Sequence, residues 1–335
     1  MAEGRILRQL IKAGALHGDE DFVKAAEALI QEERAKKHHL LANDLERILY
    51  GESSTQRYQK PTPAYDIPID RERGLPLIEV SNPIRDFQDV VLSDDNKAVL
   101  HEVLLEQNRV DVLGSYGLKP IARLLFCGPP GCGKTVSAEA LATELGLELV
   151  TIRFDAVVSS FLGETAANLR KVFDFLDRGR FIALFDEFDA IGKNRSDSAE
   201  HGELKRVVNA FLQMMDSYRG RSLLVAATNY EKYLDPALWR RFDEVLVFTR
   251  PNVEQIHHVL STKLQGIRHD LQLEDRIFLS RFKGFSYADI ERIVIRGIKS
   301  MILSGREFLT LELMDDAIRR EEHRKHVIST SQEFE

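Results

Sequence analysis

The residues with the clearest chemical meaning form a glycine-rich run near the middle of the chain. Residues 128–135 read Gly-Pro-Pro-Gly-Cys-Gly-Lys-Thr and follow the apolar stretch Arg123–Cys127. This run fits the full G-x-x-x-x-G-K-[ST] pattern of a phosphate-binding loop, between a strand and a helix as the pattern requires. Glycines let backbone N–H groups turn towards phosphates, and the positive N-terminus of the following helix adds to the attraction. The run therefore predicts a nucleotide phosphate site.

Individual roles in this loop follow from side-chain chemistry. The Lys134 ammonium can reach the β- and γ-phosphates, and the Thr135 hydroxyl can coordinate magnesium. We interpret Cys132 as a tolerated small residue rather than a nucleophile. The predicted nucleotide-binding residues of this segment are Gly128, Pro129, Pro130, Gly131, Cys132, Gly133, Lys134, Thr135 and Val136.

A second signal is an apolar run that ends in two carboxylates, Phe181–Phe185 followed by Asp186 and Glu187. Asp186 is expected to face the magnesium ion, directly or through water. Glu187 is placed to polarise a water for attack on the γ-phosphate. An ordinary acidic strand end is the alternative, and the neighbouring phosphate loop favours the catalytic interpretation.

The elements that must position these residues alternate between strand and helix from Phe87 onward. Strands are predicted from the apolar runs 123–127, 148–153, 181–185 and 222–227. Such alternation implies an α/β fold, with a parallel sheet that carries helices on both faces, as in P-loop NTPases. After Pro251 the strands stop and helical periodicity continues, so a small helical lid domain is expected over residues 251–330.

The first 85 residues have a different composition. Residues 1–50 contain no proline and show helical periodicity, which predicts a helical bundle. Five of the ten prolines lie between Pro61 and Pro83, so residues 51–85 are expected to form an extended linker. The α/β domain that carries the phosphate loop is then expected over residues 86–250.

Composition narrows the functional classes. The chain has 335 residues, with 46 Lys+Arg against 53 Asp+Glu and a net charge of −7, which argues against a nucleic-acid partner. Its apolar runs are too short to span a bilayer. Cys127 and Cys132 are the two cysteines, too few for a disulfide framework or a cysteine-based zinc site. We therefore expect a cytoplasmic protein without a membrane span.

Beyond the two phosphate-site motifs, residues 86–325 resemble AAA+ ATPases of the classical AAA clade. Residues 223–229, Leu-Leu-Val-Ala-Ala-Thr-Asn, resemble the sensor 1 strand, in which Asn229 would help to position the attacking water. Residues 234–243 resemble the second region of homology, which implies that Arg240 and Arg241 reach the neighbouring subunit as arginine fingers.

Three further segments carry the resemblance. Residues 284–289, Gly-Phe-Ser-Tyr-Ala-Asp, resemble the lid segment beside the nucleotide, which implies contact by Ala288. Residues 89–91 resemble the segment over the adenine, which implies contact by Val90. Residues 160–165 resemble the first pore loop, which implies that a protein client is gripped by Phe161, Leu162 and Gly163.

The chain departs from the family pattern in three places. Arg240 and Arg241 are adjacent, where the family usually separates them by Pro-Gly, so which of them is the finger stays open, with Arg241 preferred. Tyr287 stands where the lid motif often has glycine, so contacts with the adenosine are expected to differ. No arginine begins the lid helix, and no sensor 2 arginine is predicted.

Each secondary motif has a simpler structural alternative. Phe161 could be a core aromatic, Asn229 could cap a strand end, and the two arginines could be solvated surface charges. Their order along one chain favours the family interpretation.

The resemblance implies hydrolysis of ATP with Mg²⁺, in a site completed between subunits of a ring, expected to be a hexamer. It also implies remodelling, unfolding or translocation of a protein client, with a separate effector or protease subunit as a further partner. The alternatives are a nucleic-acid-linked loader ATPase and a nucleotide-dependent assembly scaffold.

Overall fold

The computed structural model describes residues 65–158, 162–188, 201–229 and 239–332. The predicted N-terminal bundle, residues 51–64 of the predicted linker and Phe161 lie outside these residues. Among the described helices, none is long and apolar enough to cross a membrane.

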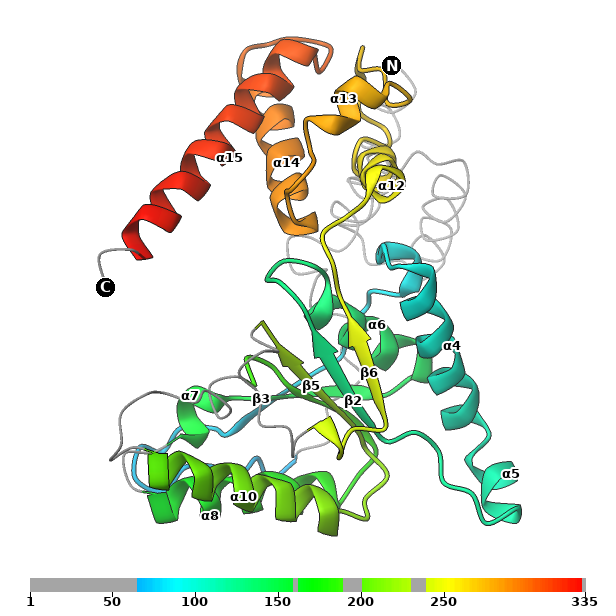
Figure 1. Ribbon diagram of the computed structural model, residues 1–335, viewed down its shortest axis with the longest axis vertical. Helices are drawn as coiled ribbons and strands as arrows, with labels where there is room; N and C mark the ends of the chain where they lie inside the picture. The colour runs from blue at the N-terminus through cyan, green and yellow to red at the C-terminus, as the bar shows by residue number, and fades with distance from the viewer. Residues whose placement is uncertain (1–64, 159–161, 189–200, 230–238, 333–335) are drawn as a thin grey trace, which may run out of the picture. The chain divides into compact units, whose positions relative to one another are not determined.

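Six strands of the described residues form one sheet, in the order β1-β3-β4-β5-β2-β6 (Figure 1). All neighbouring pairs are parallel except β1 with β3. The central strands β4 and β5 are buried along their whole length, as expected for strands with helices on both faces. The α/β prediction is therefore confirmed. The strands are β1 (Ile78–Ser81), β2 (Arg123–Cys127), β3 (Glu148–Ile152), β4 (Phe181–Phe185), β5 (Leu223–Thr228) and β6 (Glu244–Val247).

Two strands at the edges of the sheet correct the sequence analysis. Residues 51–85 were expected to be a linker, but Ile78–Ser81 is β1, with Ile78 opposite Ile152 of β3. Backbone pairing at the sheet edge thus incorporates four residues of this proline-rich segment. Strand β6 was not predicted, and it pairs with β2 through Leu246 opposite Phe126.

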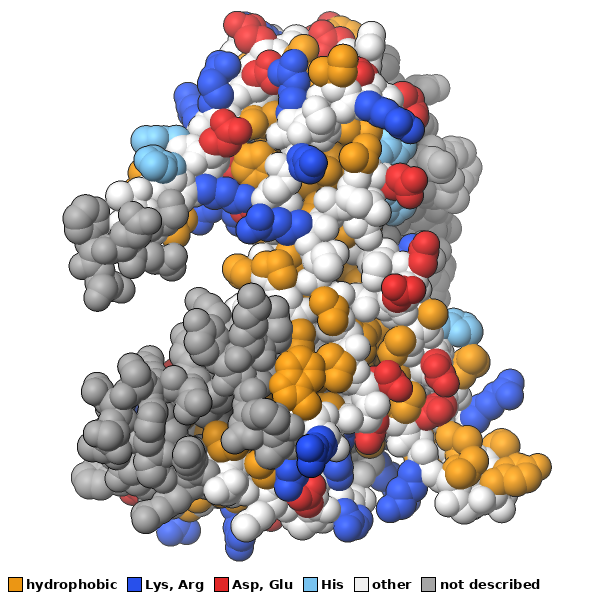
Figure 2. Space-filling model, in the orientation of Figure 1, with side chains coloured by type: hydrophobic (Ala, Val, Ile, Leu, Met, Phe, Trp, Pro, Cys, Tyr) orange, Lys and Arg blue, Asp and Glu red, His pale blue; other side chains and the backbone are white. Residues whose placement is uncertain are grey.

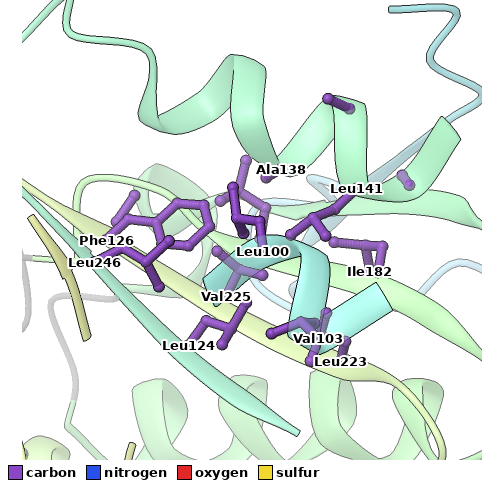
Figure 3. Close-up of a cluster of buried hydrophobic side chains, with 14 of the residues drawn as sticks. Leu100, Val103, Leu124, Phe126, Ala138, Leu141, Ile182, Leu223, Val225 and Leu246 are labelled. Atoms are coloured by element: carbon purple, nitrogen blue, oxygen red, sulfur yellow. The ribbon is translucent and has the colours of Figure 1, made fainter. Parts of the chain in front are cut away.

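The helices of the first sheet face enclose the main core. Helices α4 (Asp94–Asn108) and α6 (Lys134–Leu145) contribute Leu100, Val103, Ala138 and Leu141 to a cluster of buried side chains (Figure 3). The strands contribute Leu124, Phe126, Ile182, Leu223, Val225 and Leu246 to the same cluster. Burial of this apolar area is the main stabilising contribution, and it holds α6 firmly against the sheet.

The opposite face is covered by α8 (Leu162–Leu176) and α10 (His201–Ser217) (Figure 1). Because side chains alternate along a strand, Phe185 of β4 points away from Ile182 and towards these helices. Its ring lies 5.9 Å from that of Phe173 in α8 and 5.3 Å from that of Phe211 in α10. The two helices are thus fixed to β4 by aromatic contacts.

Short helices connect these layers: η2 (Phe87–Asp89), α5 (Val110–Ser115) and α7 (Phe154–Val157). After β6 the described chain is helical, with α12 (Val253–Lys263), α13 (Arg276–Ser280), α14 (Tyr287–Leu303) and α15 (Leu311–Gln332).

The chain divides into two compact units. One contains Met1–Tyr65, Leu264–Asp270 and Met301–Thr310, and the other contains Asp66–Lys263, Leu271–Ser300 and Leu311–Glu335. In the first unit, the amide of Leu309 donates to the Arg268 carbonyl at 2.9 Å. Every candidate site residue described below belongs to the second unit.

Candidate nucleotide-binding site

The phosphate loop connects β2 directly to α6. Gly128, Gly131 and Gly133 have φ angles of 140°, 72° and 98°, in the region that favours glycine. A Cβ at Gly128 would lie 2.0 Å from the carbonyl oxygen of Phe248, too close for any side chain. The glycine pattern is therefore required by the backbone conformation and by its close approach to the chain after β6.

Lys134 begins α6 and is almost fully buried, with 7% of its surface exposed. Its ammonium donates hydrogen bonds to the carbonyl oxygens of Gly128 at 2.6 Å and Pro129 at 3.0 Å. A third bond, of 2.8 Å, goes to Oδ1 of Asn229. These oxygens satisfy a buried cation and hold it inside the loop, beside the end of β5.

Thr135 and Asp186 bring two oxygen donors together at the same edge of the sheet. The Thr135 hydroxyl donates to Oδ2 of Asp186 at 2.8 Å, from the start of α6 to the end of β4. A hydroxyl and a carboxylate are ligands that suit Mg²⁺, which keeps several waters and completes its shell with substrate phosphates. The donor chemistry of this pair therefore fits a magnesium ion.

Glu187 has an unusual backbone conformation. Its φ angle is 51°, and among the described residues it is the one non-glycine residue with a positive φ. Its amide donates to Oδ1 of Asp186 at 2.9 Å, which supports this conformation. Left-handed backbone at a non-glycine residue is costly and occurs often at functional sites. The conformation turns the chain sharply directly after β4, where the two carboxylates follow one another.

The five polar residues of the predicted phosphate chemistry line one cavity of about 480 Å³. They come from α6 and from the ends of β4 and β5, and they are Lys134, Thr135, Asp186, Glu187 and Asn229. In parallel sheets the carboxyl ends of neighbouring strands are the usual place for ligands. Here β4 and β5 are neighbours, so their terminal residues meet beside the loop that follows β2.

The rest of the cavity wall contains a group of apolar side chains, besides the charged Arg85, Asp89, Lys263 and Glu291. Val90 and Ala288, both expected beside the nucleotide, line it together with Val91, Val136 and Tyr287. The ring of Tyr287 also packs partly against the core cluster beneath the loop. Burial raises the pKa of Tyr287 to about 12, so its hydroxyl stays protonated. This end of the cavity suits a planar aromatic base better than phosphates.

Several lining residues were missed by the sequence analysis. Val259, Thr262 and Lys263 reach the cavity from one face of α12, at the i, i+3 and i+4 spacing of a helix. Lys263 Nζ lies 2.5 Å from Oε1 of Glu291, which also lines the cavity, as does Arg85. The helical spacing could have identified a common face of α12, but nothing local indicated that this face meets the nucleotide loop.

Cys132 belongs to the loop by sequence, but its side chain is turned into the protein. It is 2% exposed and lies in the hydrophobic cluster under the sheet face. Burial raises the pKa of the Cys132 thiol, which keeps it protonated and weakly reactive. This environment agrees with a packing residue and not with a nucleophile.

The two adjacent arginines differ in their surroundings, and neither lines the cavity of its own chain. Arg241 forms an ion pair of 3.0 Å with Asp216, the penultimate residue of α10. Arg240 is exposed and has no ion-pair partner among the described residues. The structure therefore distinguishes two adjacent residues between which the sequence analysis indicated only a preference for Arg241.

The pore-loop prediction is described only in part. Phe161 lies outside the described residues, and Leu162 and Gly163 form the first turn of α8. The segment that was expected to be a loop is therefore helical from Leu162 onward.

Comparison with known proteins gives a family match over the same region. Residues 124–250 match the model of the family described as "ATPase family associated with various cellular activities (AAA)". Over 97% of both chains, the sequence is 40% identical to an uncharacterized AAA family ATPase, y4kL, of Sinorhizobium fredii.

Two further relatives are more distant and are matched only in part. A proteasome-activating nucleotidase of Thermococcus onnurineus is 32% identical over 74% of this chain and 63% of its own length. The ATP-dependent zinc metalloprotease FtsH 1 of Sphaerobacter thermophilus is 32% identical over 74% of this chain and 40% of its own length. The chain thus spans less than two thirds of either of these relatives.

Proposed function

The chain belongs to the AAA family of ATPases and is an ATP-hydrolysing enzyme, and we propose that hydrolysis takes place in the cavity beside the phosphate loop. One observation carries the proposal. A buried lysine, a hydroxyl–carboxylate pair and a carboxylate on strained backbone all line this cavity, next to a loop with three glycines of positive φ.

We place the nucleotide with its phosphates in the loop and its base at the apolar end, near Val90, Val91 and Tyr287. Phosphate oxygens would replace the neutral carbonyls now bonded to Lys134, and hydrogen bonds between charged groups are the stronger ones. Thr135 and Asp186 would hold Mg²⁺. When bound by these residues, the ion would supply positive charge to stabilise the negative charge that develops during phosphoryl transfer.

Glu187 is the proposed general base. A carboxylate at the end of β4 can orient and polarise a water in line with the γ-phosphate. Asn229 would hold the same water from the end of β5, while its Oδ1 positions the Lys134 ammonium. Asn229 directly follows β5 and Glu187 is the second residue after β4, so both side chains are positioned by strands of the buried sheet.

We propose that Arg240 acts as the arginine finger in the site of a neighbouring subunit. Its exposure and its absence from the cavity of its own chain support action in trans. Arg241 is engaged by Asp216, so the finger role passes to Arg240, against the preference drawn from sequence. A site completed in this way requires a closed ring, and we propose a hexamer.

The work powered by hydrolysis is proposed to be the remodelling or translocation of a protein client. The names of two relatives, a proteasome-activating nucleotidase and a metalloprotease, support a protein substrate. Phe161, Leu162 and Gly163 would grip the client, and residues 1–50 would bind a client or a partner such as a protease subunit. Residues 86–250, with β1, would form the large ATPase domain, and residues 251–330 the lid.

Two variants test the site. Lys134→Ala should weaken ATP binding by about 10- to 100-fold, because the phosphates lose a buried charged donor. Glu187→Gln should bind ATP like the wild type but hydrolyse it about 10²- to 10⁴-fold more slowly. Glu102→Gln, in an exposed position of α4, is the matched control and should change neither value. Normal ATP affinity of Lys134→Ala, or rapid turnover by Glu187→Gln, contradicts the assignment.

The nature of the client is tested by stimulation of the ATPase. An unfolded model protein such as casein should raise the turnover rate of the wild-type ring. Stimulation by single-stranded DNA, without a response to casein, would instead favour the nucleic-acid-linked loader.

A further inference from the structure

We propose that Lys325 of α15 is a positioning residue for nucleotide binding, because through Asp289 it holds the start of α14 against the phosphate loop. This inference rests on the proposed nucleotide site. It assigns a role in that site to a helix that contributes no residue to the cavity wall.

The first step is direct contact between the start of α14 and the loop. The amide of Ala288 donates to the carbonyl oxygen of Gly131 at 3.1 Å. A Cβ at Gly131 would lie 2.8 Å from Oγ of Ser286 and 3.0 Å from Cβ of Ala288. The corner of residues 286–288 therefore fits closely against the loop, and Tyr287 and Ala288 of this corner line the cavity.

The second step is the carboxylate that shapes this corner. Oδ2 of Asp289 accepts a hydrogen bond from the Ser286 amide at 2.9 Å, and the Asp289 amide donates to Oγ of Ser286 at 3.2 Å. This reciprocal pair is a capping box, which fixes the entry of the chain into a helix. Asp289 is only 7% exposed, so its charge needs partners.

The third step is the contact that Lys325 of α15 makes with this carboxylate. Lys325 Nζ lies 2.6 Å from Oδ2 of Asp289, the oxygen that also caps the helix. The same ammonium lies 4.2 Å from the ring centroid of Phe285 and 3.5 Å from the Gly284 carbonyl oxygen. Burial by itself would raise the pKa of Asp289, but hydrogen bonds from Lys325 and Ser286 outweigh it and lower that pKa.

A second carboxylate fixes the position of α15 relative to α14. Glu321 is fully buried and pairs with Arg292 at 3.0 Å and with Arg324 at 2.9 Å. Arg292 also pairs with Oδ1 of Asp289, so one arginine links the carboxylates of Glu321 and Asp289. Lys325 therefore contacts Asp289 from a helix whose position is itself held by an ion pair with α14.

These contacts act on binding rather than on chemistry. The corner touches the loop and the base end of the cavity, whereas Asp186 and Glu187 follow a strand of the buried sheet. Loss of the Lys325 cation should loosen residues 286–288 and raise the KM for ATP, with little change in kcat. Action on binding alone distinguishes a positioning role from a general loss of stability.

The test compares variants of the full-length protein. Lys325→Met keeps most of the side-chain volume without the charge, and Lys325→Arg restores a cation. Asp315→Asn is the matched control, because it removes the ion pair of α15 with Arg281 and leaves Asp289 untouched. The measurements are KM and kcat for ATP, equilibrium binding of ADP, and thermal unfolding.

Lys325→Met should raise KM and the Kd for ADP on the order of tenfold, the loss of one charge-assisted hydrogen bond. Lys325→Arg should recover most of this loss, and Asp315→Asn should leave KM unchanged even where it lowers the melting temperature. An unchanged KM in Lys325→Met overturns the inference, as does an equal rise in KM in Asp315→Asn. Lys134→Ala, measured in parallel, distinguishes failure of this inference from failure of the proposed nucleotide site. Normal ADP binding in that variant would mean that the nucleotide site itself is wrong.

Discussion

The two ends of the cavity are built in different ways. The phosphate end consists of one continuous loop and two strand ends, with polar side chains held by hydrogen bonds of 2.6 to 3.0 Å. The base end is assembled from segments far apart in the sequence, around the apolar or aromatic side chains of Val90, Val259 and Tyr287. The same segments also contribute the Lys263–Glu291 ion pair to the wall. Hydrogen-bonded polar groups fix the charge and direction of the phosphate end, whereas the base end is defined by the shape of its wall.

This difference suggests a division of labour. Residues anchored on buried strands are suited to the chemical step, because small displacements there change the geometry of attack. Residues carried by α12 and α14 form a surface that discriminates by burial and stacking. Changes at the phosphate end should therefore act on turnover or on all phosphate ligands, and changes at the base end should act on affinity for particular nucleotides.

The largest expected effect concerns Arg240, which we propose completes the phosphate end of the site in a neighbouring subunit. Arg240→Ala should lower kcat by about 10³-fold or more, because an arginine finger stabilises charge on the transferred phosphoryl group. ADP binding should remain normal, since Arg240 does not line the cavity of its own chain. Arg241→Ala should leave turnover nearly unchanged and cost at most about 1 kcal/mol of stability through its ion pair with Asp216.

Mixing experiments show whether this arginine acts in trans. Arg240→Ala and Lys134→Ala subunits that are shown to co-assemble should regain partial activity, because each supplies the half of the site that the other lacks. No recovery at any mixing ratio would mean that Arg240 acts within its own subunit or only structurally.

The fold could be predicted from sequence where signals are local. The four predicted strands are β2 to β5, which are short apolar runs separated by segments of helical periodicity. Strand β1 was missed because Ile78–Ser81 lies among prolines, and its pairing with β3 is a long-range contact. Strand β6 was missed because Glu244–Val247 is short and, of its four residues, only Leu246 is buried.

The residues of the site also fall into two groups, those identified from local motifs and those identified only from the structure. Lys134, Thr135 and Asp186 were identified from contiguous motifs, and the structure brings all three to one cavity. Lys263 and Glu291 carry no motif, and their meeting depends on how α12 packs beside α14. Which of the two arginines is engaged also required the structure, because the distant Asp216 makes the distinction.

An intermediate effect is expected from Tyr287 at the base end. Tyr287→Ala should raise the KM for ATP about fivefold, since an aromatic contact contributes roughly 1 kcal/mol beyond its burial. Tyr287→Phe keeps the ring and is the control, with a KM near that of the wild type. Because burial raises the pKa of Tyr287 to about 12, the difference should not change across neutral and mildly alkaline pH. A fall in kcat without a change in KM would contradict its place at the base end.

The smallest effect is expected from Cys132, which lies within the phosphate motif but faces neither end of the cavity. Cys132→Ala should keep ATPase activity within about twofold, as a modest change in a packed site. Since burial raises the pKa of the thiol, iodoacetamide should label the native protein slowly and the denatured protein quickly. Rapid inactivation of the native wild type, absent in Cys132→Ala, would show an exposed and functional thiol.

The division between the two ends is tested most directly by a ligand that has only phosphates. Binding of ATP and of inorganic triphosphate, both with Mg²⁺, should be measured by calorimetry for the wild type, Lys134→Ala and Tyr287→Ala. We predict that Lys134→Ala weakens both ligands by a similar factor, whereas Tyr287→Ala weakens ATP and leaves triphosphate unchanged. Equal losses for both ligands in Tyr287→Ala, or normal triphosphate binding in Lys134→Ala, would contradict the account.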